Sequence, residues 1–435
     1  MALSTLGCKV NQYESAGILE ALDTTLFSIV PFNTKADCYI INTCTVTGRT
    51  DYQSRQLIRR AIKTNPDASI IVTGCYAQIT AEEIARIPGI TLITGTAEKE
   101  NIPCLLQKMA KGSPQILVGD IGQVHHFSGL SPKKFPGHTR AFLKIQDGCN
   151  SYCSYCIVPY ARGRSRSLPE EKVINQIETL VRSGYREVVL TGIHLGIYGQ
   201  DLLPPSTLLN ILRHVNANGT VERLRLSSIE ITEVSNDIIH LMADSATICR
   251  HLHIPLQSGD DRTLVAMMRS YDAAFFRSRL EEIYRAMPDI AIGLDVMAGF
   301  PGEGEEEFEN TLLLIDAFPV AYIHVFPYSD RPGTAASRLP GAVRADEKKK
   351  RVKILRDIGQ KKRNAFAERF IKKKLSVLVE DKKDRITGLM KGYSDNYIPV
   401  LITDGDFSLS RKIVNVIPDD AREGRLFGRT TNHDG

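Results

Sequence analysis

The sequence has no hydrophobic run long enough to cross a membrane. A spanning helix needs roughly 18 apolar residues, and no stretch of the 435-residue chain approaches that length. The N-terminal segment MALSTLGCKVNQ also lacks a basic stretch followed by an apolar one, which is the pattern of a secretion signal. We therefore expect a cytoplasmic protein without a membrane partner.

The cysteine content excludes a fold based on disulfides. The chain has nine cysteines, an odd number, and without a secretion signal they are not expected to form a disulfide framework. Reduced thiols that bind metals are the better interpretation. The hydrophobic content of 43% is enough for ordinary cores, and the length predicts two to four domains.

Positive charge is concentrated in one segment. The net charge is only +5, but residues 344–374 contain fourteen Lys or Arg and four acidic residues. Apolar residues recur there at helical spacing, which predicts an amphipathic helix with one buried face and one cationic face; they are Val352, Leu355, Ile358, Phe366 and Phe370. Such a charge run is either a solvated helix face or a surface for nucleic acid.

Three cysteines lie close together in the segment GCNSYCSYC. Cys149, Cys153 and Cys156 form a C-x3-C-x2-C run. Three thiolates at this spacing can hold three irons of a [4Fe-4S] cube and leave the fourth iron open. The alternative is a structural zinc site, which normally has four protein ligands, and no fourth ligand is evident at zinc spacing. The motif therefore favours an iron–sulfur cluster with a reactive iron.

The N-terminal region repeats one unit three times. An apolar strand is followed by a cysteine and then by a helix-like stretch: ALSTLG before Cys8, CYIINT before Cys44 and SIIVTG before Cys75. This alternation predicts a doubly wound parallel sheet, in which the carboxyl ends of the strands converge on one edge. The three thiols should meet there and could hold a second [4Fe-4S] cluster. A lone cysteine at a strand end is more often a small buried residue, and we expect Cys38, Cys104 and Cys249 to be packing residues.

Six further apolar strands alternate with helical stretches. They are AFLKIQ, REVVLTGI, RLRLSSIE, HLHIPLQ, IAIGLDVMAGF and AYIHVFPYS. Six such units predict a partial (β/α)6 barrel with a lateral opening, rather than the closed form with eight strands. The functional loops of such barrels lie at the carboxyl ends of the strands, and the run that contains Cys149 follows the first strand at that end. The cluster and the barrel mouth should therefore coincide.

Other loops at the same end of the predicted barrel are polar and rich in glycine. Gly192 in LTGIHLG and Gly299 in AGFPGE would let a ligand approach the backbone closely, and Gln257 belongs to the polar segment LQSG. Glu230, at the end of the third strand, could accept hydrogen bonds from ribose hydroxyls or pair with a nearby arginine. We predict these four residues as cofactor contacts.

Short β-branched stretches separated by Asp, Gly, Asn and Pro fill residues 375–430. They predict a small antiparallel β-barrel, which resembles the TRAM domain, an oligonucleotide-binding-like (OB-like) barrel of tRNA-modifying enzymes. Lys391 and Tyr393 are candidate RNA contacts, together with Tyr397, Arg411 and Lys412, because cations and aromatic faces bind RNA. The alternative is that the tyrosines fill the core of the barrel.

Motifs along nearly the whole chain resemble the radical S-adenosylmethionine methylthiotransferases. They are TLGCKVNQYE, INTCTVT, VTGCYAQ, GCNSYCSYCIVPYARGRSRS, PLQSGDDRTLVAMMRSY, GFPGE and HVFPYSDRPGT. The resemblance implies a methylthiotransferase domain over residues 1–125 with an auxiliary cluster, a radical core over 135–370 that ends in the basic helix, and a TRAM domain over 372–435. It also implies that S-adenosylmethionine binds the open iron beside Cys149, with Tyr155 near its adenine.

The segments GCKVN and NTCTVT are most similar to the branch that acts on N6-threonylcarbamoyladenosine in tRNA. The resemblance implies an enzyme that adds a methylthio group to carbon 2 of this base, 3′ of the anticodon. Its partners would be tRNA, an electron donor such as flavodoxin or ferredoxin, and a sulfur donor. The same chemistry on N6-isopentenyladenosine in tRNA or on a ribosomal-protein aspartate is the alternative, and a non-catalytic iron–sulfur RNA-binding protein is a remote one.

A pocket for threonylcarbamoyl should offer cations or hydrogen-bond donors, because this substituent carries a carboxylate. Lys9, Asn11 and Arg49 lie beside the N-terminal cysteines in sequence, and we predict them as substrate contacts. Arg162 and Arg164 follow the cluster loop and are further candidates for contact with phosphate or substrate, with simple salt bridges as the alternative.

Overall fold

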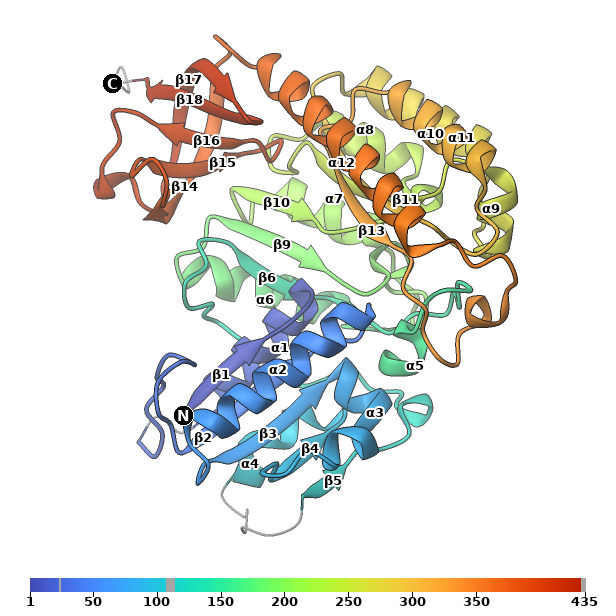
Figure 1. The fold of residues 1–435 in the computed structure, drawn as a ribbon. Helices are drawn as coiled ribbons and strands as arrows, with labels where there is room; N and C mark the ends of the chain where they lie inside the picture. The colour runs from blue at the N-terminus through green and yellow to red at the C-terminus, as the bar shows by residue number, and fades with distance from the viewer. Residues whose placement is uncertain (23–24, 107–113, 432–435) are drawn as a thin grey trace.

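The computed structural model describes residues 1–22, 25–106 and 114–431. Three parts follow one another along the chain (Figure 1): an α/β layer at the N-terminus, an open barrel of parallel strands, and a small closed β-barrel near the C-terminus. The open barrel lies between the other two parts. Within the described ranges, no helix is both long enough and apolar enough to cross a membrane.

Five parallel strands form the N-terminal sheet, in the order β1-β2-β3-β4-β5. The strands are β1 (Ala2–Thr5), β2 (Cys38–Thr43), β3 (Ser69–Gly74), β4 (Leu92–Thr94) and β5 (Gln115–Leu117), and the helices are α1 (Lys9–Glu20), α2 (Gly48–Thr64), α3 (Cys75–Ala85) and α4 (Ile102–Leu106). Alternate residues of a strand face opposite sides, so Tyr39 and Ile41 pack on the side of α2 and α3, while Ile40 packs on the side of α1 and α4. Helices on both faces confirm the predicted doubly wound arrangement.

Six parallel strands form the open barrel, which confirms the predicted partial barrel. They are β6 (Ala141–Lys144), β9 (Glu187–Thr191), β10 (Arg223–Leu226), β11 (His251–Gln257), β12 (Ala291–Ala298) and β13 (Tyr322–Pro327). Two three-stranded sheets are joined by single bridges, Leu224 to Ile248 and Ser228 to His253. In the described part of the chain β6 and β13 do not pair with each other, so the barrel is open between them, and α1 lies against β6.

Helices between these strands pack their apolar faces on the outside of the barrel in one continuous core. The helices of this part are α5 (Val158–Arg162), α6 (Glu170–Arg182), α7 (Leu208–Asn218), α8 (Asn236–Asp244), α9 (Asp261–Ala266), α10 (Ala273–Ala286) and α11 (Glu305–Asp316). A short antiparallel pair, β7 (Gln146–Asp147) and β8 (Arg166–Ser167), brackets the cysteine loop. Short 3₁₀ helices occur at Glu98–Asn101, Ile121–Gln123, Leu195–Ile197, Ile231–Glu233, Ala335–Arg338 and Phe407–Leu409.

The predicted basic helix is α12 (Ala345–Glu368). It runs beside β13 and reaches the closed barrel (Figure 1). Val352, Leu355 and Phe366 are buried as predicted. Not every cation of the segment is on the surface, because Arg351 is buried in an ion pair with Glu303 at 2.6 Å.

The C-terminal strands close into a barrel in the order β14-β15-β16-β18-β17. They are β14 (Leu375–Lys383), β15 (Met390–Ser394), β16 (Pro399–Ile402), β17 (Ile413–Arg422) and β18 (Arg425–Thr430). We predicted an antiparallel barrel, and the pairings are antiparallel except for β16 with β18, which is parallel. An odd number of strands cannot alternate direction all the way round a closed barrel, so one parallel pair is required.

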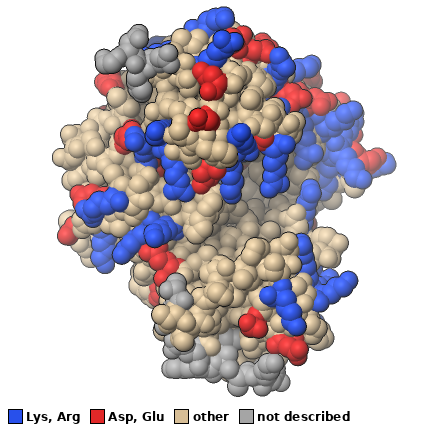
Figure 2. Space-filling view, turned by 90° about the vertical axis from the view of Figure 1, so that its left-hand side faces the viewer, with Lys and Arg blue, Asp and Glu red and all other residues tan. Residues whose placement is uncertain are grey.

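The closed barrel packs against one end of the open barrel. Near the start of β10, Arg223 Nη2 donates to the carbonyl of Ser376 at 2.6 Å, and Arg225 Nη1 donates to the carbonyl of Asp395 at 2.8 Å. Arg225 also pairs with Glu187 at 2.7 Å. These buried guanidinium groups fix the third part against the second. Figure 2 shows a hollow between the two barrels above and the N-terminal sheet below. Lys and Arg gather along the upper rim of this hollow.

Candidate functional site

Three cysteines of the N-terminal sheet meet at its carboxyl edge. Thr43 of β2 is paired with Gly74 of β3, so the next residues, Cys44 and Cys75, leave the sheet side by side. Gly7 brings the end of β1 to the same point, since a Cβ at this residue would lie 2.8 Å from Cys44 Sγ. Its φ of +94° is one that glycine adopts readily. Cys8 follows directly, and the three side chains lie together.

The surroundings of these thiols fit a metal cluster. Burial, together with the neighbouring Cys75 and Cys8, raises the pKa of Cys44 to about 12, whereas Cys8 is exposed. Arg162 Nε donates to Cys75 Sγ at 3.3 Å, which stabilises a thiolate. Clustered thiols that resist ionisation on their own lose their protons when they bind a metal cation. Three of them match a [4Fe-4S] cluster with one open iron.

The second cysteine set lies in the loop between β7 and α5. Cys149 Sγ is 3.4 Å from His194 Nδ1, and Arg269 Nη1 donates to Cys153 Sγ at 3.4 Å. Burial opposes the ionisation of Cys149, but hydrogen bonds, chiefly the one with His194, outweigh it and lower its pKa. Burial raises the pKa of Cys156 to about 12. Donor groups around three clustered sulfurs fit a second cluster of the same kind.

One cavity of about 190 Å³ lies where the second cysteine loop, the open barrel and the loop after β2 meet. Its walls are Tyr155, Cys156, Ile157 and Val158 of the cluster loop, Gln257, Asp295, Met297 and residues 326–329 of the barrel, and Val46 and Thr47 of the N-terminal sheet. The N-terminal sheet is fixed over the barrel mouth by an ion pair of Arg331 with Asp51 at 2.7 Å, and by a hydrogen bond from the Gly48 amide to Ser329 Oγ at 2.9 Å. Cys156 of the second set therefore lines this cavity, and Val46 and Thr47 bring to it the loop that follows Cys44.

A buried ionic network connects the two cysteine sets, and sequence analysis missed it. Arg162 Nη1 lies 2.6 Å from Glu14 and 3.2 Å from Asp147, and Lys144 and Lys99 also pair with Glu14. Burial acts to raise the pKa of Glu14, but these three cations outweigh it and hold the pKa at about 2. The signal in the sequence was Lys144 and Asp147, two charged residues within or beside an apolar strand.

Two of the predicted substrate contacts are buried. Arg162 is only 1% exposed and also donates to Asn11 Oδ1 at 2.5 Å. The salt-bridge alternative therefore describes Arg162, and its predicted contact with phosphate does not fit this burial. Asn11 is fully buried and donates to the carbonyls of Leu6 at 2.7 Å and Thr43 at 3.0 Å. Both residues support the cysteine edge from inside the protein.

The other substrate candidates near the cysteines are accessible. Lys9, Arg49 and Arg164 have exposed side chains. Lys9 is the first residue of α1, and no described residue forms an ion pair with it. Desolvation by the surrounding protein lowers the pKa of Lys9, and the charges of Arg140 and Arg225 lower it further. A free ammonium group among other cations is a place where an anion would be stabilised.

The candidates for cofactor contact differ in what surrounds them. Tyr155 and Gln257 line the 190 Å³ cavity. Glu230 forms an ion pair with Arg269, the same arginine that donates to Cys153, and this pairing is the alternative that we gave for it. Glu230 therefore acts on the cluster loop through Arg269.

The two glycines predicted as ligand contacts make room for protein side chains. A Cβ at Gly192 would lie 2.9 Å from Gln146 Oε1. A Cβ at Gly299 would lie 2.2 Å from Cγ of Lys348. Glycine is needed at both positions because a neighbouring chain segment packs there, which sequence alone could not distinguish from the approach of a ligand.

The RNA candidates of the closed barrel lie where it meets the open barrel. Lys391 pairs with Glu380 at 3.4 Å. Tyr393 stacks on Tyr397 with ring centroids 5.0 Å apart, and Arg140 of the open barrel lies 4.7 Å from the Tyr393 ring centre. Tyr393 is therefore at the junction of the two barrels and is not a core residue of the closed one.

The three remaining cysteines of our prediction do not behave alike. Cys38 and Cys249 are buried, as expected for packing residues, but Cys104 is exposed. The prediction for Cys104 is wrong, because the helix α4 that carries it turns this position towards solvent. Cys104 also lies apart from both cysteine sets in the sequence, which makes it a suitable control for changes to either set.

A chain of hydrogen bonds joins the adjacent strands β11, β12 and β13 of the open barrel, and sequence analysis also missed it. Tyr322 Oη lies 2.8 Å from His251 Nε2 and 3.0 Å from His253 Nδ1. His253 and His324 contact the carboxylate of Asp295 at 2.9 and 3.4 Å. The sequence did contain a signal for this chain, because polar residues occur at alternate positions of apolar strands and such residues face the same side.

Comparison with known proteins agrees with this geometry. Residues 1–95 match a family model described as Uncharacterized protein family UPF0004, and residues 143–315 match the Radical SAM superfamily. Threonylcarbamoyladenosine tRNA methylthiotransferase MtaB of Bacillus subtilis (strain 168) is 40% identical over 420 residues, which are 96% of this chain and 93% of that protein. The tRNA-2-methylthio-N(6)-dimethylallyladenosine synthase of Carboxydothermus hydrogenoformans is 33% identical over 81% of each chain.

A second MtaB and one solved structure complete the comparison. The MtaB of Aquifex aeolicus (strain VF5) is 36% identical over 92% of this chain and 96% of its own length. The radical S-adenosylmethionine methyltransferase TsrM of Kitasatospora setae has a TM-score of 0.54 at 16% identity, covering 74% of this chain and 72% of TsrM, and this likeness concerns the fold alone. On the identity and coverage of its curated relatives, the chain belongs to the radical S-adenosylmethionine tRNA methylthiotransferase family.

Proposed function

We propose that this protein is an enzyme that adds a methylthio group to carbon 2 of N6-threonylcarbamoyladenosine in tRNA. The substrate assignment rests on a difference in sequence identity between two groups of relatives. The two proteins named for threonylcarbamoyladenosine described above are 40% and 36% identical to the chain, whereas three proteins named for dimethylallyladenosine are 31% to 33% identical. The free cation of Lys9 supports this choice, because threonylcarbamoyl carries a carboxylate and dimethylallyl does not.

The two cysteine sets would hold the cofactors of the reaction. Cys8, Cys44 and Cys75 would bind one [4Fe-4S] cluster, and the C-x3-C-x2-C loop would bind the other, with S-adenosylmethionine beside Tyr155 and Gln257. When bound, these groups supply a carbon-centred radical able to remove hydrogen from an unactivated carbon. The walls of the 190 Å³ cavity would confine the reacting base between both sets and limit the access of water.

Donor groups behind the cysteines would orient the ligands. Arg162 contacts Cys75, Arg269 contacts Cys153 and His194 contacts Cys149. Contacts of this kind fix the direction of a metal-bound thiolate and tune its basicity. Because Arg162 also pairs with residues of both parts, it would keep the two cluster sites in one fixed arrangement.

The tRNA would bind across the hollow seen in Figure 2. Exposed lysines of α12 that have no ion pair with any described residue, among them Lys349 and Lys353, would attract its phosphates. An electron donor such as flavodoxin or ferredoxin and a sulfur donor would complete the set of partners. A tRNA substrate also fits the cytoplasmic location predicted from the sequence.

The direct test uses purified protein with reconstituted iron–sulfur clusters. It is given S-adenosylmethionine, a reductant and tRNA that bears N6-threonylcarbamoyladenosine. Mass spectrometry of the nucleosides should detect the 2-methylthio derivative, and tRNA with unmodified adenosine at the same position should remain unchanged. Cleavage of S-adenosylmethionine without any methylthiolated nucleoside would refute the proposal.

A further inference from the structure

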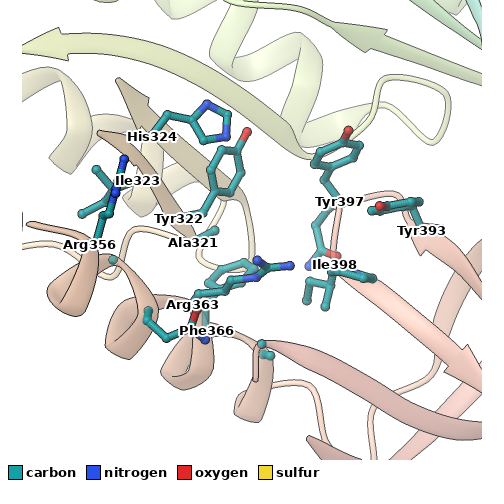
Figure 3. Close-up of a pocket in the computed structure, with 16 residues that line it drawn as sticks. Ala321, Tyr322, Ile323, His324, Arg356, Arg363, Phe366, Tyr393, Tyr397 and Ile398 are labelled. Atoms are coloured by element: carbon teal, nitrogen blue, oxygen red, sulfur yellow. The ribbon is translucent and has the colours of Figure 1, made fainter. Parts of the chain in front are cut away.

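A second cavity lies where α12, β13 and the closed barrel meet. Its volume is about 370 Å³, which is within the range of small-molecule pockets. In Figure 3, Tyr322 and His324 of β13 lie on one side, Tyr393 and Tyr397 of the closed barrel lie on the other, and Arg363 of α12 reaches between them. None of the cofactor candidates named above lines this cavity.

Two guanidinium groups line this cavity without a counter-ion. Arg356 and Arg363 are seven residues apart on α12, so they lie on the same face of the helix. Neither forms an ion pair or a side-chain hydrogen bond with any residue in the described ranges. Other arginines of this segment are paired, as Arg351 is with Glu303 and Arg369 with Asp289. Unpaired guanidinium groups beside a cavity suit an anionic ligand, and phosphate above all.

The closed barrel makes room for one of these arginines. Gly424 lies in the turn between β17 and β18 with a φ of +69°, and a Cβ at this position would lie 2.3 Å from Cγ of Arg363. The stem of Arg363 therefore rests directly on the turn, and its guanidinium group extends into the cavity. The position of the guanidinium group depends on contacts from two different parts of the protein.

Aromatic side chains form part of the remaining walls. Tyr393 and Tyr397 form a stacked pair, and Tyr322 and Phe366 add two more rings. Aromatic rings together with guanidinium planes are the groups on which unstacked RNA bases are held, and stacking of this kind depends little on the identity of the base. The chemistry of the cavity therefore fits a nucleotide, with a flat base and a phosphate.

Strand β13 connects this cavity with the cofactor cavity. Tyr322 and His324 line the 370 Å³ cavity, while Phe326 and Pro327 line the 190 Å³ cavity. His324 and Phe326 are two residues apart, which is about 7 Å along a strand at ~3.3 Å per residue. A base in the cofactor cavity would thus have the neighbouring nucleotide of its chain within reach of the second cavity.

We propose that this cavity binds an unpaired nucleotide of the tRNA anticodon loop, next to the modified adenine. Its base lies among Tyr322, Tyr393 and Tyr397 and stacks on the guanidinium plane of Arg363, and its phosphate contacts Arg356. The inference rests on the proposed function, because it takes tRNA as the substrate. It adds that the enzyme holds two unstacked nucleotides. One is the adenosine that reacts, and the other fixes the position of the anticodon loop in the site.

The test is a double-mutant cycle between protein and RNA. Anticodon stem–loops that bear N6-threonylcarbamoyladenosine are made with an abasic site at one or the other flanking nucleotide, and their affinity for the holoenzyme is measured. At one flanking position, loss of the base should weaken binding to the wild type about tenfold. In the Arg363→Ala variant the same loss should have a smaller effect, because both changes remove the contact between the base and this guanidinium group.

Lys361→Ala is the matched control, since it removes one positive charge from α12 at a residue that does not line the cavity. It should leave the effect of the abasic site unchanged. Iron content, circular dichroism and cleavage of S-adenosylmethionine exclude misfolding of either variant. An abasic effect at neither flanking position, or one of equal size in the wild type and in Arg363→Ala, would overturn the inference. Failure of the proposed function would instead show as normal binding of the intact stem–loop without methylthiolation.

Discussion

The two cysteine sets are assembled by different routes along the chain. Cys149, Cys153 and Cys156 belong to one loop that the β7–β8 pair brackets. Cys8, Cys44 and Cys75 follow three separate strands and lie together only when β1, β2 and β3 are in register. A local metal motif can form wherever its loop is placed, whereas a distributed one exists only in the folded sheet.

The difference has a consequence for stability. Contacts around the local set are mainly with barrel residues such as His194 and Arg269. The distributed set is tied to the barrel by Arg162, whose partners Glu14 and Asp147 come from different parts of the chain. We therefore expect the N-terminal set to be more sensitive to changes outside its own ligands.

The largest effect should come from removing each set in turn. Replacing Cys149, Cys153 and Cys156 by Ala should abolish cleavage of S-adenosylmethionine. Replacing Cys8, Cys44 and Cys75 by Ala should preserve cleavage to 5′-deoxyadenosine but abolish methylthio transfer, because the two sets have separate roles. Cys104→Ala is the control and should lose neither iron nor activity. Loss of cleavage in the N-terminal triple variant, with the other cluster intact by electron paramagnetic resonance, would contradict the division of roles.

The next effect concerns the buried network. Arg162→Met would leave Glu14 and Asp147 as buried carboxylates without this partner, and such a change typically costs about 3–5 kcal/mol. Urea unfolding should show this loss of the free energy of unfolding, and iron bound by the N-terminal set should fall as well. Arg164→Met changes an exposed side chain of the same loop and should cost little. Equal stability of the two variants would show that the network does not hold the cluster sites together.

The same network should respond to acid. Its cations hold the pKa of Glu14 at about 2, below the ordinary value of 4.5. A carboxyl group with a lowered pKa in the folded state stabilises the protein above the ordinary pKa and loses this contribution as pH falls towards the lower value. The difference in unfolding free energy between the wild type and Glu14→Gln should therefore shrink from pH 4.5 to about 2. A constant difference over this range would show that Glu14 is not ionised in the folded protein.

A smaller effect should separate the substrates. If Lys9 binds the carboxylate of threonylcarbamoyl, Lys9→Ala should lower kcat/KM for tRNA with this group about tenfold, the loss of one charge-assisted hydrogen bond. The value for tRNA with isopentenyladenosine should change little. Lys63→Ala, at the far end of α2 from the cysteine edge, is the control. A parallel loss with both substrates would assign Lys9 a general role in RNA binding.

The smallest effect concerns one lysine that would neutralise a single phosphate. Lys353 is an exposed residue of α12 that has no ion pair within the described ranges. Lys353→Ala should weaken tRNA binding slightly and make the slope of log affinity against log salt shallower by about 0.7 to 0.9, the value for one phosphate. Fluorescence anisotropy over a series of salt concentrations measures this slope, and an unchanged slope would remove Lys353 from the tRNA surface.

Much of the fold could be predicted because its signals are local. Alternating strands and helices specified the parallel sheets, and the position of each cysteine directly after a strand placed it at the carboxyl edge. The burial of Arg162 could not be predicted, since Glu14 is 148 residues away in sequence. The packing roles of Gly192 and Gly299 could not be predicted either. A glycine at a strand end leaves space for a ligand or for a neighbouring side chain, and the sequence does not distinguish the two.

The closed barrel shows what is missed when each segment of the sequence is interpreted separately. Its sequence, with the basic helix before it, predicts a separate RNA-binding module. Arg223 and Arg225 donate to its backbone carbonyls, so its deletion would expose buried cations of the open barrel. Single charge changes on α12 are therefore the appropriate test, and they could be chosen only with the structure.

The central claim, that the site selects the threonylcarbamoyl substituent, is tested most directly by competition. The reconstituted enzyme is given equal amounts of two tRNAs that differ only in the group on nitrogen 6, threonylcarbamoyl or isopentenyl, and both methylthio products are quantified in one reaction by mass spectrometry. We predict a clear excess of the 2-methylthio derivative of threonylcarbamoyladenosine. An excess of the isopentenyl product, or equal amounts of both, would contradict the substrate assignment.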